Sequence, residues 1–173
     1  MAHLTIDFFS NCLRRTVQFQ MIIPGDFCHT WQIEQKRKGK RMKTLFLLHG
    51  YTGAAENWVP DNLSTLYNFA IVMPSGENGF WVDGPATGHQ YGAFIGEELP
   101  DYIRKTFGLA MNPEETYIMG LSMGGFGALH TALQYPETFG KVAALSSALI
   151  IHEIAHMQPG GSNEVANSEY YHG

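Results

Sequence analysis

The stretch that decides the fold is residues 117–130, Tyr117-Ile118-Met119-Gly120-Leu121-Ser122-Met123-Gly124-Gly125-Phe126-Gly127-Ala128-Leu129-His130. It starts with a short apolar run typical of a buried strand and continues into a turn rich in glycine. The residues behind the turn are small or apolar, which allows a helix to pack closely on a sheet. The pattern predicts a strand, a tight turn and a helix in direct succession.

Within this stretch, residues 120–124 fit the pattern Gly-x-Ser-x-Gly, in which a strained strand-to-helix turn lifts a serine hydroxyl above the sheet edge. Side chains at Gly120 or Gly124 would collide with neighbouring backbone, and a residue at positive φ carries strain. The serine also lies at a helix N-terminus, where free N–H groups favour negative charge. Ser122 is therefore a candidate nucleophile.

Size and composition favour one globular domain over residues 1–173, since 173 residues with 45% hydrophobic content can bury a core. The first residues lack a basic region followed by an apolar run, and no segment reaches membrane-spanning length. We therefore expect no membrane contact and a cytoplasmic location. Cys12 and Cys28 lack metal-ligand spacing and are expected to be reduced packing residues.

The net charge of −5 hides an asymmetry, because six of the eleven basic residues lie within residues 36–43. Such a run is a candidate contact for nucleic acid or lipid. Here it lies between two strand-like runs, where connections are solvated loops. We expect no nucleic-acid partner.

Alternating apolar and polar residues at 4–9 and 16–23 predict half-buried antiparallel strands. The nearly all-apolar run at 44–50 predicts a strand of a parallel sheet covered on both faces. Further strands are expected at 69–74 and 142–148. Helices are expected for about ten residues through Leu66, over 91–107 with a kink at Pro100, and behind the glycine turn as far as Pro136.

The long connection over residues 77–90 holds Trp81, Asp83 and His89, which either line a substrate pocket or pack the loop. Alternation of strands and helices from residue 44 onward predicts an α/β fold with a mostly parallel sheet and helices on both faces. Ser122 would then lie at the C-terminal end of a central strand, where open α/β sheets place their sites.

The combined motifs resemble the α/β-hydrolase esterases of the tributyrin esterase and S-formylglutathione hydrolase group. They are Leu47-Leu48-His49-Gly50 with Gly53 and Trp58, Val72-Met73-Pro74, Glu97-Glu98-Leu99-Pro100, and Gly120-Leu121-Ser122-Met123-Gly124-Gly125. The resemblance implies hydrolysis of short-chain acyl esters or thioesters through an acyl-serine, with no cofactor and no metal. It also implies an oxyanion hole made by the N–H groups of Met123 and Tyr51.

The chain departs from this family behind Ser122. The acid and the histidine of the triad follow the serine in this fold, yet no aspartate occurs after Asp101. The chain therefore resembles the first two-thirds of a hydrolase that lacks the last strands, with residues 150–173 as the start of a substrate-side insertion or a tail. We assign no catalytic acid or histidine.

A histidine from elsewhere in the chain is the alternative source of the general base. His130 lies about 12 Å along the helix from Ser122, and we expect it to be a packing residue. The tail holds the other candidates, which are His152, His156 and His172, with Glu153, Glu164 or Glu169 as orienting acid. Both contacts of such a triad require hydrogen-bond reach.

The missing strands would leave the sixth strand with an unpaired apolar edge, so we expect association with a second copy.

Two rival functions stay open. Residues 152–156 fit His-Glu-x-x-His, which on a helix presents two imidazoles, here His152 and His156, to zinc and Glu153 as a base. Alternatively, the chain is a catalytically incomplete fragment or a binding protein.

Overall fold

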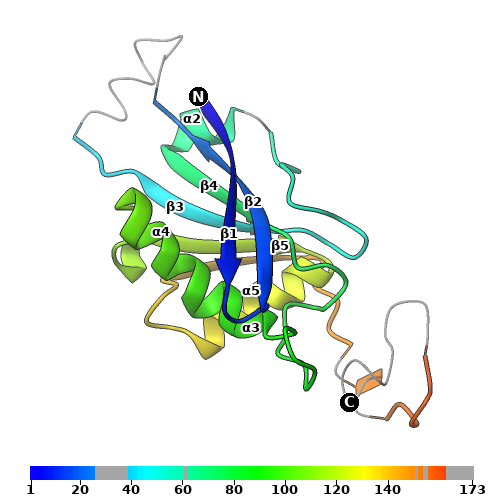
Figure 1. The fold of residues 1–173 in the computed structure, drawn as a ribbon. Helices are drawn as coiled ribbons and strands as arrows, with labels where there is room; N and C mark the ends of the chain where they lie inside the picture. The colour runs from blue at the N-terminus through cyan, green and yellow to red at the C-terminus, as the bar shows by residue number, and fades with distance from the viewer. Residues whose placement is uncertain (26–38, 61, 151, 154–155, 163–173) are drawn as a thin grey trace.

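The computed structural model describes residues 1–25, 39–60, 62–150, 152–153 and 156–162 (Figure 1). Among them, six strands form one sheet in the order β1-β2-β4-β3-β5-β6. The strands are β1 Ala2–Ser10, β2 Arg15–Ile23, β3 Lys43–Leu48, β4 Phe69–Pro74, β5 Thr116–Leu121 and β6 Lys141–Leu145. β1 pairs antiparallel with β2 and β2 with β4, whereas β4, β3, β5 and β6 are parallel.

The helical elements lie between the parallel strands. They are α2 Leu63–Tyr67, α3 Tyr91–Ala93, the π-helix η1 Phe94–Glu98, α4 Leu99–Phe107, the 3₁₀ helix η2 Pro113–Glu115, and α5 Met123–Gln134. The expected α/β fold with a mostly parallel sheet is confirmed. No helix in the described part of the chain is long and apolar enough to cross a membrane.

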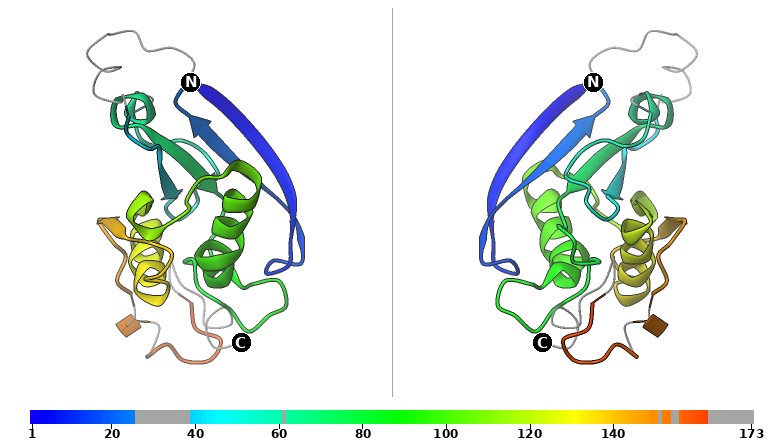
Figure 2. Two further views of the ribbon diagram at one scale, coloured as in Figure 1. Left: turned by 90° about the vertical axis from the view of Figure 1, so that its left-hand side faces the viewer. Right: turned by 90° about the vertical axis from the view of Figure 1, so that its right-hand side faces the viewer.

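Two hydrophobic clusters lie on opposite faces of the sheet. The larger joins Phe46, Val72 and Ile118 of the sheet to residues of α4 and α5, and the smaller joins Leu47 and Ile71 to residues near α2. Figure 2 shows α4 and α5 side by side, with α2 away from both. Helices therefore lie on both faces, as the sequence predicts.

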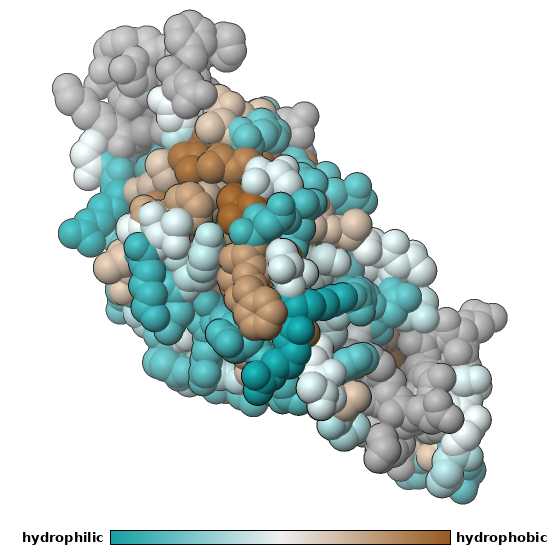
Figure 3. Space-filling view, in the orientation of Figure 1, coloured by the Kyte–Doolittle hydropathy of each residue, from teal (hydrophilic) through white to brown (hydrophobic). Residues whose placement is uncertain are grey.

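The first strand confirms the predicted alternation, whereas β2 keeps it only as far as Met21, because Ile22 is also buried, in the smaller cluster. In β1, Leu4, Ile6 and Phe8 are half-buried against the larger cluster, and the residues between them are exposed. The face seen in Figure 3 is accordingly mostly hydrophilic, with a narrow hydrophobic band near its middle. These strands extend the parallel sheet on one side by an antiparallel hairpin.

The helix expected to run for about ten residues through Leu66 is wrong in length, because α2 has five residues. Asn57 uses its side-chain amide to donate to the carbonyl of Val59 and to accept from the N–H of Val59. Pro60 follows directly. A residue before proline is steered away from helical φ and ψ, so the helix starts only beyond this turn.

The helix expected over 91–107 has the predicted extent, and its irregularity lies in the turn directly before Pro100. Residues Phe94–Glu98 form a π-helix between α3 and α4. Pro100 follows this π-helix within the same continuous helical run. A proline inside a helix lacks the N–H that would bond back to the preceding turn, and its ring crowds the carbonyl four residues earlier, here that of Gly96 in the π-helix. The distortion therefore lies in the turn that the proline disrupts.

The sixth strand is shorter than expected, since Lys141–Leu145 is followed by Ser146 at φ 43°. It is the last strand of the sheet, with Val142 42% and Leu145 39% exposed. The exposed strand edge in the described structure matches the expectation. Association through this edge stays a prediction.

Glu98 ties the β1–β2 turn to the helical layer. Its carboxylate accepts from the Ser10 hydroxyl at 2.5 Å and from the backbone N–H groups of Asn11 at 2.6 Å and Cys12 at 3.3 Å. Burial and the nearby Glu98 raise the pKa of the Cys12 thiol to about 12, so this free thiol stays protonated. Cys28 lies outside the described residues.

We predict that Glu98→Ala lowers the free energy of unfolding by about 2 kcal/mol, because it leaves two backbone donors without their charged acceptor. Urea unfolding of both proteins measures the change. Glu97→Ala is the matched control, since Glu97 is the exposed neighbour on the same π-helix. Equal losses in the two variants would contradict the anchoring role.

Candidate active site

Ser122 occupies the single residue between β5 and α5, with φ 57° and ψ −115°. Positive φ is strained for a residue with a side chain and persists only where surrounding structure enforces it. The Ser122 N–H donates to the Leu145 carbonyl at 2.9 Å, and its own carbonyl accepts from Phe126 at 3.0 Å and Ala148 at 3.1 Å. The strained turn expected at Ser122 is present.

The glycines of the turn are required by space. A Cβ on Gly120 would meet the backbone of Gly124 and lie 2.8 Å from the nitrogen of Gly125. A Cβ on Gly124 would meet the Leu48 carbonyl and lie 2.5 Å from the carbonyl oxygen of His49. The start of α5 therefore packs directly on the end of β3, backbone to backbone.

The loop behind β3 lies against the candidate nucleophile. A Cβ on Gly50 would lie 3.6 Å from Cβ of Ser122. Within the described residues, the N–H groups of Tyr51 and Met123 have no hydrogen-bond acceptor. These two N–H groups belong to the β3 loop and to the first residue of α5, the two elements from which the resemblance implies an oxyanion hole.

His49 is a buried side chain of this region for which the sequence suggested no role beyond its motif. Its Nε2 accepts from the N–H of Gly76 at 2.9 Å, and its Nδ1 lies 2.7 Å from the Gly50 carbonyl oxygen. Since Nε2 is an acceptor, the hydrogen-bond network places the proton on Nδ1, which donates to Gly50. Burial lowers the pKa of His49, so the ring is neutral at neutral pH.

The long loop packs rather than opening a pocket at Trp81. Trp81 is fully buried, and its Nε1 donates to the His49 carbonyl at 3.4 Å. Asp83 accepts from the N–H of Ala93 at 3.0 Å and so caps the start of the helical layer. His89 lies edge-on to Tyr91, with ring centroids 6.3 Å apart. The packing interpretation holds for Trp81 and Asp83.

No histidine in the described part of the chain hydrogen-bonds to the Ser122 side chain. His130 is exposed and stacks on Phe126. The rings of His152 and His156 stack with centroids 4.3 Å apart, and Nδ1 of His156 lies 2.8 Å from the His152 carbonyl oxygen. The tail residues His172, Glu164 and Glu169 lie outside the described residues, as do Ile154 and Ala155 of the His-Glu-x-x-His pattern.

The described residues hold no group of three or more histidine, cysteine or acidic side chains placed to bind a metal. Much of the basic run also falls outside them. Lys40 and Arg41 are its described loop members, and Arg41 pairs with Glu115 at 3.5 Å. The described side chains thus add no support to a zinc site or to a nucleic-acid contact.

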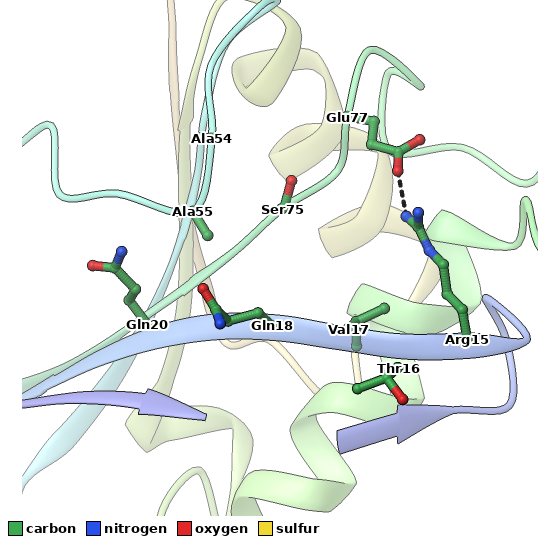
Figure 4. A pocket seen from close by; sticks show the side chains of 9 residues that line it. All are labelled: Arg15, Thr16, Val17, Gln18, Gln20, Ala54, Ala55, Ser75 and Glu77. Carbon is green, nitrogen blue, oxygen red and sulfur yellow. Dashed lines mark hydrogen bonds and ion pairs between the residues drawn. The ribbon is translucent and has the colours of Figure 1, made fainter. Parts of the chain in front are cut away.

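An open cleft of about 390 Å³ lies beside the same loops (Figure 4). Gln18 and Gln20 of β2 extend toward the backbone of residues 54–55 and toward Ser75. At one end Arg15 forms an ion pair with Glu77. Ser122 is not among the lining residues, so the cleft neighbours the candidate nucleophile's loops without containing it.

Comparison with known proteins decides the family. The model of the family described as "Putative esterase" matches residues 10–163. The chain belongs to this esterase family. An acetyl esterase of Caldicellulosiruptor saccharolyticus is 38% identical over 175 residues, which cover 99% of the chain and 65% of that protein. The chain therefore spans just under two-thirds of this relative.

Solved structures agree on the fold of the esterase domain. A fluorophosphonate-binding serine hydrolase of Staphylococcus aureus superposes with a TM-score of 0.77 at 23% identity, covering 98% of this chain and 65% of that one. An S-formylglutathione hydrolase of the same organism gives 0.68 at 26% identity, covering 84% and 57%. The expected α/β-hydrolase fold and the esterase resemblance are confirmed.

We predict that Gly124→Ala lowers the free energy of unfolding by about 3 kcal/mol, since the added Cβ overlaps two carbonyl groups that cannot move independently of the sheet. Chemical denaturation checks the value. Gly25→Ala is the control, because a Cβ there meets nothing within 4 Å, and it should change stability by less than about 0.5 kcal/mol. Similar effects at both positions would mean that the turn tolerates a side chain.

Proposed function

We propose that this chain carries the nucleophile of a serine esterase that hydrolyses short-chain acyl esters or thioesters through an acyl-serine intermediate. The observation that carries the proposal is the strained Ser122, at φ 57° at the N-terminus of α5 and close enough to Gly50 that a Cβ there would lie 3.6 Å from its own Cβ. Ser122 lies directly behind the carboxyl end of β5, between β3 and β6, and backbone strain at such positions is concentrated at functional sites. Presentation of its hydroxyl is the reason that such strain is retained.

In this mechanism Oγ of Ser122 attacks the acyl carbonyl carbon while its proton passes to a general base. The carbonyl oxygen becomes an oxyanion, which accepts hydrogen bonds from the N–H groups of Tyr51 and Met123. Collapse of the intermediate expels the alcohol or thiol, which takes up the proton. Water then attacks the acyl-serine by the same steps and restores the hydroxyl. The proposal assigns no cofactor.

The comparisons support the substrate class in outline. The relative at 38% identity is named an acetyl esterase, and the neighbour at 26% identity is named an S-formylglutathione hydrolase. Both names describe a short acyl group, carried on oxygen in the first and on sulfur in the second. The proposal therefore covers small esters and thioesters, and it names no histidine or acid of this chain as the catalytic partner.

We predict that the purified chain hydrolyses p-nitrophenyl acetate and butyrate, and that Ser122→Ala abolishes this turnover. Intact mass after treatment with a fluorophosphonate should show one adduct on the original chain and none on the variant. Ser75→Ala, a serine that lines the neighbouring cleft, is the control and should keep the adduct. Absence of both turnover and adduct would favour the non-catalytic binding protein.

We also propose that two copies associate through the edge of β6. This strand has exposed apolar residues and no partner on its outer side in the described structure. Unpaired apolar edges pair with other chains unless they are charged or covered.

The cytoplasmic location expected from the composition stays a prediction.

Val142→Lys tests the association, because a charge on the edge disfavours strand pairing. Light scattering after size exclusion should show a dimer for the original chain and a monomer for the variant. Thr5→Lys is the matched control, since Thr5 is exposed on β1, the opposite edge strand of the sheet. A chain that is already monomeric at high concentration would refute the association.

A further inference from the structure

Two hydrogen bonds fix the peptide between Gly50 and Tyr51, in the loop that supplies the proposed Tyr51 donor. The carbonyl of Gly50 accepts from Nδ1 of His49 at 2.7 Å and from the N–H of Gly53 at 3.0 Å. This carbonyl and the N–H of Tyr51 belong to the same planar peptide and point in opposite directions. Whatever fixes the direction of the Gly50 carbonyl therefore also fixes the direction of the Tyr51 N–H.

The imidazole of His49 is itself fixed from its other side. The Gly76 N–H donates to Nε2, and the ring packs edge-on against Trp81 with centroids 5.1 Å apart. A Cβ on Gly53 would lie 3.0 Å from Nδ1, so the loop closes tightly over the ring. Burial has the largest effect on the pKa of the His49 ring and lowers it, whereas the negative charge of Glu56 raises it. The ring therefore has one orientation and one protonated nitrogen.

We propose that His49 is a positioning residue, whose Nδ1–H orients the Gly50–Tyr51 peptide so that the Tyr51 N–H is directed at the oxyanion formed on Ser122. The proposal rests on the proposed esterase function. The imidazole links the loop behind β3 to the loop behind β4. Its bond to Gly76 holds the ring in place, and the ring in turn orients the Tyr51 N–H through the Gly50 carbonyl. His49 takes no proton from the substrate or from Ser122.

Two substitutions separate the contacts of the ring. Asn at position 49 offers an amide near the place of Nδ1 and loses the bond to Gly76. Gln reaches the place of Nε2 and loses the bond to Gly50. We expect His49→Gln to lower kcat for p-nitrophenyl acetate about 10²-fold, the usual effect of losing one oxyanion donor, with KM within about twofold. His49→Asn should stay within about tenfold of the original kcat.

His130→Asn is the matched control, because His130 is an exposed histidine on α5, and it should leave kcat and KM unchanged. Both position-49 variants lose the packing of the imidazole, so a merely structural role would lower kcat in both to the same degree. Equal losses in the Asn and Gln variants would overturn the proposal. So would a rise in KM with kcat unchanged.

A second measurement does not depend on turnover. In ¹⁵N NMR spectra of histidine-labelled protein, His49 should appear as the neutral tautomer with its proton on Nδ1, and the Tyr51 amide signal should shift in His49→Gln more than in His49→Asn. A proton on Nε2 would overturn the proposal whatever the activity, also if the Gln variant does not fold. If the chain neither hydrolyses esters nor binds the fluorophosphonate, the esterase proposal fails, and these spectra still decide whether His49 orients the peptide.

Discussion

The geometry at Ser122 depends on a contact between two backbones that leaves no space for a side chain. Gly124, in the first turn of α5, lies against the carbonyl groups of Leu48 and His49 at the end of β3. This contact sets the start of α5 beside the loop that contains Gly50 and Tyr51. The two N–H groups proposed for the oxyanion thus come from one rigid junction, and their separation does not rely on flexible side chains.

Much of the sheet is predictable from local patterns. The alternation at residues 4–9 corresponds to β1, whose inner side chains pack on the larger cluster. The apolar run from Thr44 corresponds to β3, which is buried almost throughout. The extent of α5 follows from the Tyr135-Pro136 pair, because a proline disfavours helical conformation in the residue before it. In each case the deciding constraint lies within a few residues of its effect.

The parts that escape prediction depend on contacts between distant residues. α2 is short because side-chain bonds of Asn57 compete with the helix, which propensity alone does not reveal. The bonds from Gly76 to His49 and from Trp81 to His49 join residues 27 and 32 positions apart. The motif identifies Ser122 as the strained residue of the turn, because the glycines that the turn requires are its near neighbours in sequence. No neighbouring residue in the sequence shows which nitrogen of His49 carries the proton.

The hydrogen bonds of Ser122 connect this candidate nucleophile to the most exposed strand of the sheet. Its N–H donates to Leu145, and its carbonyl accepts from Ala148, directly behind β6. Every residue of β6 is exposed, and such edges open locally at lower free energy than central strands. Each opening removes bonds that hold Ser122 at positive φ and lets its backbone relax. We therefore expect local opening of β6, rather than global unfolding, to limit how long Ser122 keeps its positive φ.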